Sequence, residues 1–155
     1  MSIEQISNWF GKVFPNPGPR NITTQLGVHF EEVAEMLGTL RGGGQEADER
    51  LKALATTIEA FGNDLKAGRI SVVVDDEVEM LDSLCDQVVT AIGVGHLHGM
   101  DVVGAIKEVA DSNDSKFGED GMPIFDENLK VRKGPSYFRP DLARFLRREN
   151  GPTPE

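Results

Sequence analysis

Residues 21–40 read NITTQLGVHFEEVAEMLGTL, and their apolar side chains recur at the spacing of an α-helix. Positions three or four residues apart share one face of a helix, so this stretch predicts an amphipathic helix with a single apolar face. Thr23 or Thr24 is expected to cap its start, and the helix should stop before Gly42-Gly43-Gly44. Its apolar face is expected to consist of Leu26, Phe30, Val33, Leu37 and Leu40.

The same periodicity recurs along the chain and predicts an all-α protein, a bundle of four or five helices. Further helices are expected at about residues 2–13, 46–66, 75–98 and 102–112. The inward faces of the 46–66 and 75–98 helices should hold Leu51, Leu54, Ile58, Phe61 and Leu65, and Val78, Leu81, Cys85, Val89 and Ile92. Gly and Pro dominate after residue 112. We therefore expect one domain over residues 1–155, with a core at about 21–112 and an irregular C-terminal arm at about 113–148.

The composition excludes several classes of protein. A net charge of −10 argues against a nucleic-acid-binding protein, which would normally carry a basic patch. No apolar run approaches the roughly 20 residues of a membrane span, and the N-terminus lacks the features of a signal peptide. Cys85 is the only cysteine, so an internal disulfide is excluded, and we expect it to pack as a small apolar residue. These observations favour a cytoplasmic protein.

Two acidic clusters carry the strongest functional signal. Glu31, Glu32 and Glu35 lie about one turn apart on the helix that should start at Thr23 or Thr24, and they point away from its apolar face. Glu79 and Asp82 also lie about one turn apart, on the 75–98 helix. Hard divalent cations such as Mg²⁺ take carboxylate oxygens as ligands. A metal site is therefore the leading interpretation, and a solvated helix face is the alternative.

The second cluster belongs to a longer acidic stripe, which runs from Asp75 through Glu79 and Asp82 to Asp86. This stripe borders the apolar face of its helix. Acids beside a core are costly to desolvate unless they are paired or bound to a cation, so the stripe strengthens the metal interpretation.

The two clusters also carry a resemblance to a known family. EEVAE at 31–35 and EMLD at 79–82 resemble the EExxE…ExxD signature of the all-α nucleoside triphosphate pyrophosphohydrolases, which include MazG-like and phosphoribosyl-ATP pyrophosphohydrolase-like enzymes. SNDSKF at 112–117 and LKVRKGPSYF at 129–138 are similar to segments of small members of that superfamily. The resemblance spans roughly residues 25–142.

The resemblance implies cleavage of a nucleoside triphosphate between its α and β phosphates, giving a monophosphate and pyrophosphate. Mg²⁺, or Mn²⁺ in its place, would be bound by Glu32, Glu35, Glu79 and Asp82. Glu31 and Glu32 are the candidate catalytic residues, with Glu31 as an outer ligand or positioning the attacking water. Metal ions neutralise developing phosphate charge and activate water, which suits this chemistry.

Asp86 lies one turn beyond Asp82 and could join the metal ligands or hold one of them in place. Continuation of a polar stripe is an equally good interpretation of Asp86.

The expected substrate-binding residues lie in the C-terminal third of the chain. Asn113 and Lys116 match family positions that would contact phosphates or sugar, although Lys116 also suits a solvated surface position. Lys130 and Lys133 precede a Gly-Pro turn that would direct them back toward the acids. Tyr137 could stack on a base or pack in the core.

The chain departs from compact members of the family, because residues 36–78 separate the two acidic motifs and contain an extra predicted helix. The resemblance also implies a homodimer or homotetramer that binds a nucleotide substrate. Two alternatives remain: hydrolysis of another pyrophosphate metabolite, such as phosphoribosyl-ATP or an alarmone, and a non-enzymatic acidic helical module that binds a basic partner.

Overall fold

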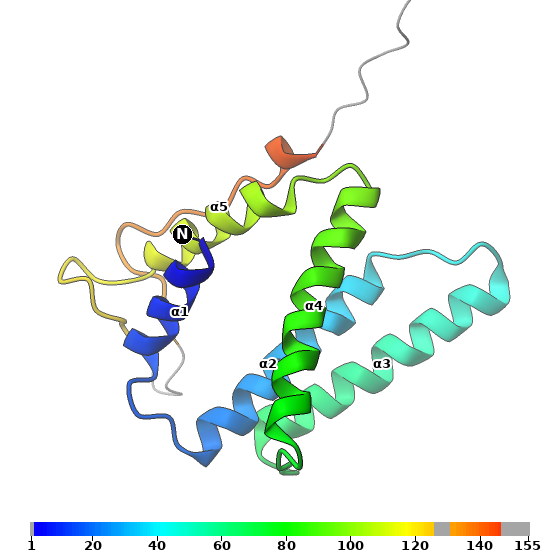
Figure 1. Ribbon diagram of the computed structural model, residues 1–155, viewed down its shortest axis with the longest axis horizontal. Helices are drawn as coiled ribbons and strands as arrows, with labels where there is room; N and C mark the ends of the chain where they lie inside the picture. Colours follow the sequence, from blue (N-terminus) through cyan, green and yellow to red (C-terminus); the bar gives the residue numbers. More distant parts are fainter. Residues whose placement is uncertain (1, 126–130, 147–155) are drawn as a thin grey trace, which may run out of the picture. The chain divides into compact units, whose positions relative to one another are not determined.

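The computed structural model describes residues 2–125 and 131–146, and it is all-α (Figure 1). Five α-helices follow one another, with two isolated β-bridges but no strand in the described ranges. They are α1 (Ser2–Val13), α2 (Pro19–Gly38), α3 (Gln45–Ala67), α4 (Glu77–Leu97) and α5 (Val102–Asp114), and a short 3₁₀ helix, η1, lies at Ala143–Phe145. The predicted fold class is therefore confirmed. None of the described helices has the length and apolar character needed to cross a membrane.

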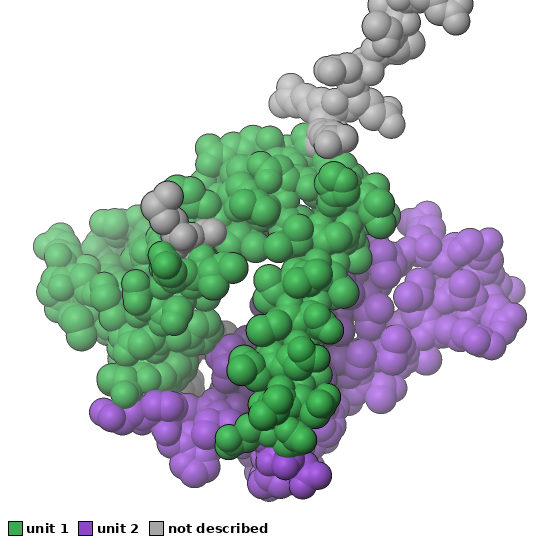
Figure 2. Space-filling model, viewed as in Figure 1, with its two compact units in different colours: residues 1–15, 76–155 green, residues 16–75 purple. Residues whose placement is uncertain are grey.

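The chain divides into two compact units (Figure 2). Unit 1 comprises residues 1–15 and 76–155, and unit 2 comprises residues 16–75. Unit 1 contains α1, α4, α5 and η1, whereas unit 2 contains α2 and α3. The expectation of a single domain stays a prediction.

Unit 2 is a hairpin of two long helices that approach closely at two glycines. An added Cβ on Gly27 would lie 2.6 Å from the Gly62 carbonyl oxygen, and one on Gly62 would lie 2.9 Å from the Gly27 carbonyl oxygen. Both glycines and Leu65 are buried. Arg20 joins the start of α2 to the end of α3, because its guanidinium donates hydrogen bonds to the carbonyl oxygens of Leu65 (3.0 Å) and Lys66. The absence of side chains at the crossing therefore allows backbone contact between α2 and α3.

Helix α2 begins four residues before the earlier of the two predicted caps. Gly18 is the N-cap and Pro19 is the first helical residue, so neither Thr23 nor Thr24 caps the helix. Proline suits this position because its missing N–H would have no intrahelical acceptor. The Asn21 side chain accepts a hydrogen bond from the Gly18 N–H at 2.9 Å, which fixes the turn into the helix.

In unit 1, α5 is contacted by α1, α4 and η1. Trp9 of α1 stacks on Phe117 just beyond α5, with ring centroids 5.8 Å apart, and its indole N–H donates to the Asn113 carbonyl oxygen at 3.0 Å. Residues 131–146, which we term the docked arm, are held along α5 by several hydrogen bonds. The predicted irregular C-terminal segment is thus ordered against α5 over these residues.

Helix α4 exposes apolar side chains along most of its length. Val78, Val89 and Leu97 are 76%, 64% and 86% exposed, and among the described helices of unit 1, α4 contacts α5 alone. Cys85 is exposed as well, so the expectation that it packs was wrong. A helical apolar pattern predicts which residues share a face, but not whether a neighbour covers it.

The inward face of α3 is also covered only in part. Leu65 is fully buried, whereas Leu54 is 49% exposed and the Phe61 ring packs edge-on against Phe30 of α2 while remaining partly exposed. Unit 2 provides a single partner helix, so only the side chains nearest the helix crossing lose contact with solvent.

Replacing Gly27 with Ala should destabilise unit 2 by about 1–3 kcal/mol, because the new methyl group would force the backbones of α2 and α3 apart. The urea midpoint of unfolding, followed by circular dichroism, measures this effect. Gly38→Ala is the matched control, since a Cβ there meets nothing within 4 Å. Equal midpoints for the two variants would contradict the close crossing.

Candidate functional site

The acids of α2 differ in their surroundings. Glu32 and Glu35 are exposed, and no ion pair or side-chain hydrogen bond engages them within the described part of the chain. Glu31 instead pairs with Lys66 of α3, with 2.7 Å between the ammonium nitrogen and the carboxylate oxygen. The sequence analysis placed Glu31 away from the apolar face of α2, but it did not foresee that a lysine of the next helix would reach this acid.

The acids of α4 lie on an exposed helix whose start is capped by Asp76. The Asp76 carboxylate accepts hydrogen bonds from the backbone N–H groups of Val78 (2.9 Å) and Glu79 (3.1 Å), which orients the first turn. Glu79, Asp82 and Asp86 are all exposed. The argument that this stripe borders a desolvated core was wrong, since the apolar side chains beside it are exposed too.

The four predicted metal ligands are divided between the two units. Glu32 and Glu35 belong to unit 2, and Glu79 and Asp82 belong to unit 1. Among residues 2–125 and 131–146, no group of three or more His, Cys, Asp or Glu side chains is arranged to hold a metal ion. Each helix therefore supplies a pair of carboxylates about one turn apart rather than a complete ligand set.

Asn113 and Lys116 lie together at the C-terminal end of α5. The Lys116 ammonium donates a hydrogen bond to the Asn113 side-chain oxygen at 2.8 Å. The Asn113 backbone carbonyl binds the indole of Trp9, so α1 adjoins the predicted substrate residues. These two residues are thus neighbours, as their helical spacing predicts.

The docked arm brings Lys133 and Tyr137 together. The Lys133 ammonium lies 4.6 Å from the centroid of the Tyr137 ring, in a cation–π contact. Tyr137 is half-buried and Lys133 is exposed. Lys130, the other predicted lysine, lies outside the described residues.

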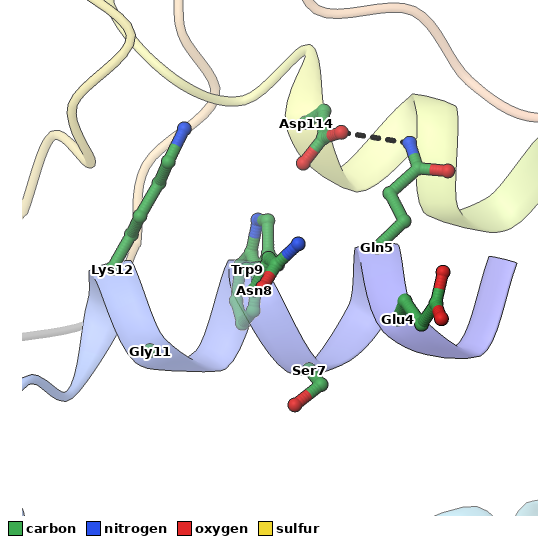
Figure 3. A pocket seen from close by; sticks show the side chains of 8 residues that line it. All are labelled: Glu4, Gln5, Ser7, Asn8, Trp9, Gly11, Lys12 and Asp114. Atoms are coloured by element: carbon green, nitrogen blue, oxygen red, sulfur yellow. Dashed lines mark hydrogen bonds between the residues drawn. The ribbon is translucent and has the colours of Figure 1, made fainter. Parts of the chain in front are cut away.

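A groove of about 820 Å³, lined mostly by polar residues, follows α1 (Figure 3). Its lining includes Gln5, Asn8, Trp9 and Lys12 of α1 and Asp114 of α5. In Figure 3 the Gln5 amide reaches Asp114 across the gap between the helices, with a hydrogen bond of 2.7 Å. The sequence analysis did not predict this groove, because its polar residues follow no acidic or metal-ligand pattern.

Gln5 also joins an ionic contact on α5. Its amide donates to Asp111 at 3.0 Å, and the Lys107 ammonium contacts the other Asp111 oxygen at 2.5 Å. The hydrogen bond from Lys107 lowers the pKa of the Asp111 carboxyl most, and the hydrogen bond from Gln5 lowers it further. The charged form of Asp111 therefore supports the packing of α1 on α5.

Searches against protein-family models, curated proteins and solved structures find no match to this chain.

The stability of unit 1 should depend on the charge of Asp111. Its folded pKa is lowered, so its contribution is fully present above the ordinary value of 3.8 and is lost as the pH falls from there through the folded pKa. Urea unfolding between pH 5 and pH 2, followed by the fluorescence of Trp9, measures this loss. Asp111→Asn should show a smaller decrease over the same interval, and an unchanged slope would contradict the assignment.

Proposed function

We propose that this protein is a Mg²⁺-dependent nucleoside triphosphate pyrophosphohydrolase, which cleaves its substrate between the α and β phosphates. Two pairs of carboxylates carry the proposal. Glu32 and Glu35 form one pair on α2, and Glu79 and Asp82 form the other on α4. All four are exposed on long helices, and none is neutralised by a cation of the described chain. A protein with a net charge of −10 can use such pairs to bind a nucleotide that arrives with its metal ion.

The chemistry of the donors fits Mg²⁺, because all four side chains offer the hard oxygen ligands that this ion prefers. A bound Mg²⁺ would neutralise charge on the phosphates and activate the attacking water.

The remaining residues have different proposed roles. Glu31, held by Lys66, would help orient the attacking water beside Glu32. Lys133 would contact phosphate oxygens, Tyr137 would contact the base, and Asn113 with Lys116 would contact the sugar or phosphates. Asp86, one turn beyond Asp82, would support that ligand.

Replacing Glu35 with Gln, or Asp82 with Asn, should reduce pyrophosphate release from a panel of dNTPs and NTPs by at least about 100-fold, because each change removes a charged metal ligand. Release should require Mg²⁺, or Mn²⁺ in its place. Glu59→Gln is the matched control, since Glu59 is an exposed acid of α3 outside both motifs.

The products distinguish the alternatives. Inorganic phosphate in place of pyrophosphate would contradict cleavage at the α–β bond. Turnover of phosphoribosyl-ATP or an alarmone, but of no canonical nucleotide, would favour the related hydrolase. Wild-type behaviour of Glu35→Gln would favour a non-enzymatic acidic module.

We also propose that the protein is a homo-oligomer, a dimer or tetramer, in which α4 contributes to the interface. The support is the exposed apolar surface of α4, which a helix of a soluble protein normally buries. A second copy of the chain would bring an identical apolar surface, as two-fold symmetric interfaces require.

Val89→Asp should shift the oligomer toward the 16.9 kDa single chain, because it places a charge in the middle of the apolar surface of α4. Sedimentation velocity measures the mass. Val73→Asp is the control, since Val73 is 91% exposed and lies outside α4. A wild-type protein that sediments as a single chain at all concentrations would contradict the proposal.

A further inference from the structure

Two serines of α5 and its C-terminal end bind both backbone polar groups of one residue in the docked arm. The Ser112 hydroxyl donates to the Phe138 carbonyl oxygen at 2.8 Å, and the Phe138 N–H donates to the Ser115 hydroxyl oxygen at 3.2 Å. The Ser115 hydroxyl in turn donates to the Ser112 carbonyl oxygen at 2.7 Å. We refer to Ser112 and Ser115 as the serine clip.

The clip provides hydrogen-bond partners for the N–H and C=O groups of Phe138, as a neighbouring strand would do in a sheet. Ser112 is 3% exposed, so its hydroxyl would carry a desolvation cost without the Phe138 carbonyl as acceptor. Each clip contact binds the arm through its backbone rather than through a side chain. The arm can therefore be held in place while its side chains remain available to a ligand.

The start of the arm is fixed by a close backbone approach. The Gly134 N–H donates to the Lys116 carbonyl oxygen at 2.9 Å, and a Cβ on Gly134 would collide with the carbonyl oxygens of Lys116 and Phe117. Tyr137 closes a turn by donating its N–H to the Gly134 carbonyl oxygen at 3.2 Å. The arm is thus anchored at Gly134 and at Phe138, on either side of Tyr137.

This anchoring sets the position of the Lys133–Tyr137 pair. Lys133 directly precedes Gly134, and Tyr137 directly precedes Phe138, so both anchors adjoin the pair. The 4.6 Å contact between the Lys133 ammonium and the Tyr137 ring then fixes where the positive charge lies. Loss of the clip would free Tyr137 and, through it, the lysine.

We infer that Ser112 and Ser115 are positioning residues, which hold the docked arm so that Lys133 and Tyr137 can bind the nucleotide. This inference rests on the proposed function. The serines contact the arm rather than the substrate, so they act on binding and not on the chemical step. Their loss therefore raises KM and leaves kcat nearly unchanged.

The test combines hydrogen–deuterium exchange with kinetics on the full chain. Ser115→Ala should speed exchange in the peptide that contains Phe138 by about fivefold, the effect of losing one hydrogen bond. KM for the preferred nucleotide should rise by about fivefold, with kcat within about twofold of the wild type. Ser115→Thr, which keeps the hydroxyl, should restore both values. Ser112→Ala should act in the same direction.

Ser136→Ala is the matched control, because Ser136 is an exposed serine of the same arm. A wild-type KM in Ser115→Ala, despite faster exchange, would overturn the positioning role alone. Unchanged exchange would overturn the clip itself, and an equal KM increase in Ser136→Ala would overturn the positioning role. If the unaltered protein released no pyrophosphate from any nucleotide, the proposed function and the positioning role would both fail, whereas the exchange data would still decide whether the clip holds the arm.

Discussion

Helix α5 is the constraint on which unit 1 depends, because α1, α4 and η1 all contact it. A helix of 12 residues such as α1 is marginal by itself in water, so α1 depends on its packing against α5. That packing includes polar contacts through Gln5 and an aromatic stack between Trp9 and Phe117. The same helix carries Ala110 and Ser112, which are almost completely buried. The positions of Asn113 and Lys116 therefore follow from the contacts that stabilise unit 1.

Unit 2 is stabilised in a different way. Its two helices meet at Gly27 and Gly62, where the absence of Cβ atoms lets the backbones touch, and Arg20 binds carbonyl groups at the end of α3. Such a crossing tolerates little change in volume, since backbone atoms cannot move aside as flexible side chains do. The exposed faces of the hairpin are less constrained. Glu32 and Glu35 lie on such a face, so the packing of unit 2 neither requires nor excludes their acidity.

Helical periodicity predicted the five helices to within a few residues, because the spacing of apolar positions is a local property. The start of α2 was missed because Pro19 at the first helical position outweighed the threonine caps. Helical periodicity does not predict contacts between residues that are far apart in the sequence. The ion pair between Glu31 and Lys66 of α3 could not be predicted from the spacing within α2. Cys85 was expected to be buried, but the described residues of unit 1 leave it exposed. The sequence did not predict the serine clip, because its hydrogen bonds join side chains to an irregular backbone segment without periodicity.

The two chemical halves of the proposed site are fixed by different physics. Carboxylates three residues apart on one helix remain neighbours in any tertiary arrangement, because the helix itself sets their spacing. The docked arm has no such local order, and Lys133 keeps its place only through contacts with α5 and the loop after it. Under the proposed function, nucleotide binding through the arm could therefore change independently of the acids. Nucleotide preference would then change most easily through substitutions in the arm and in the residues of α5 that hold it. Neither is needed to keep the spacing of the carboxylate pairs.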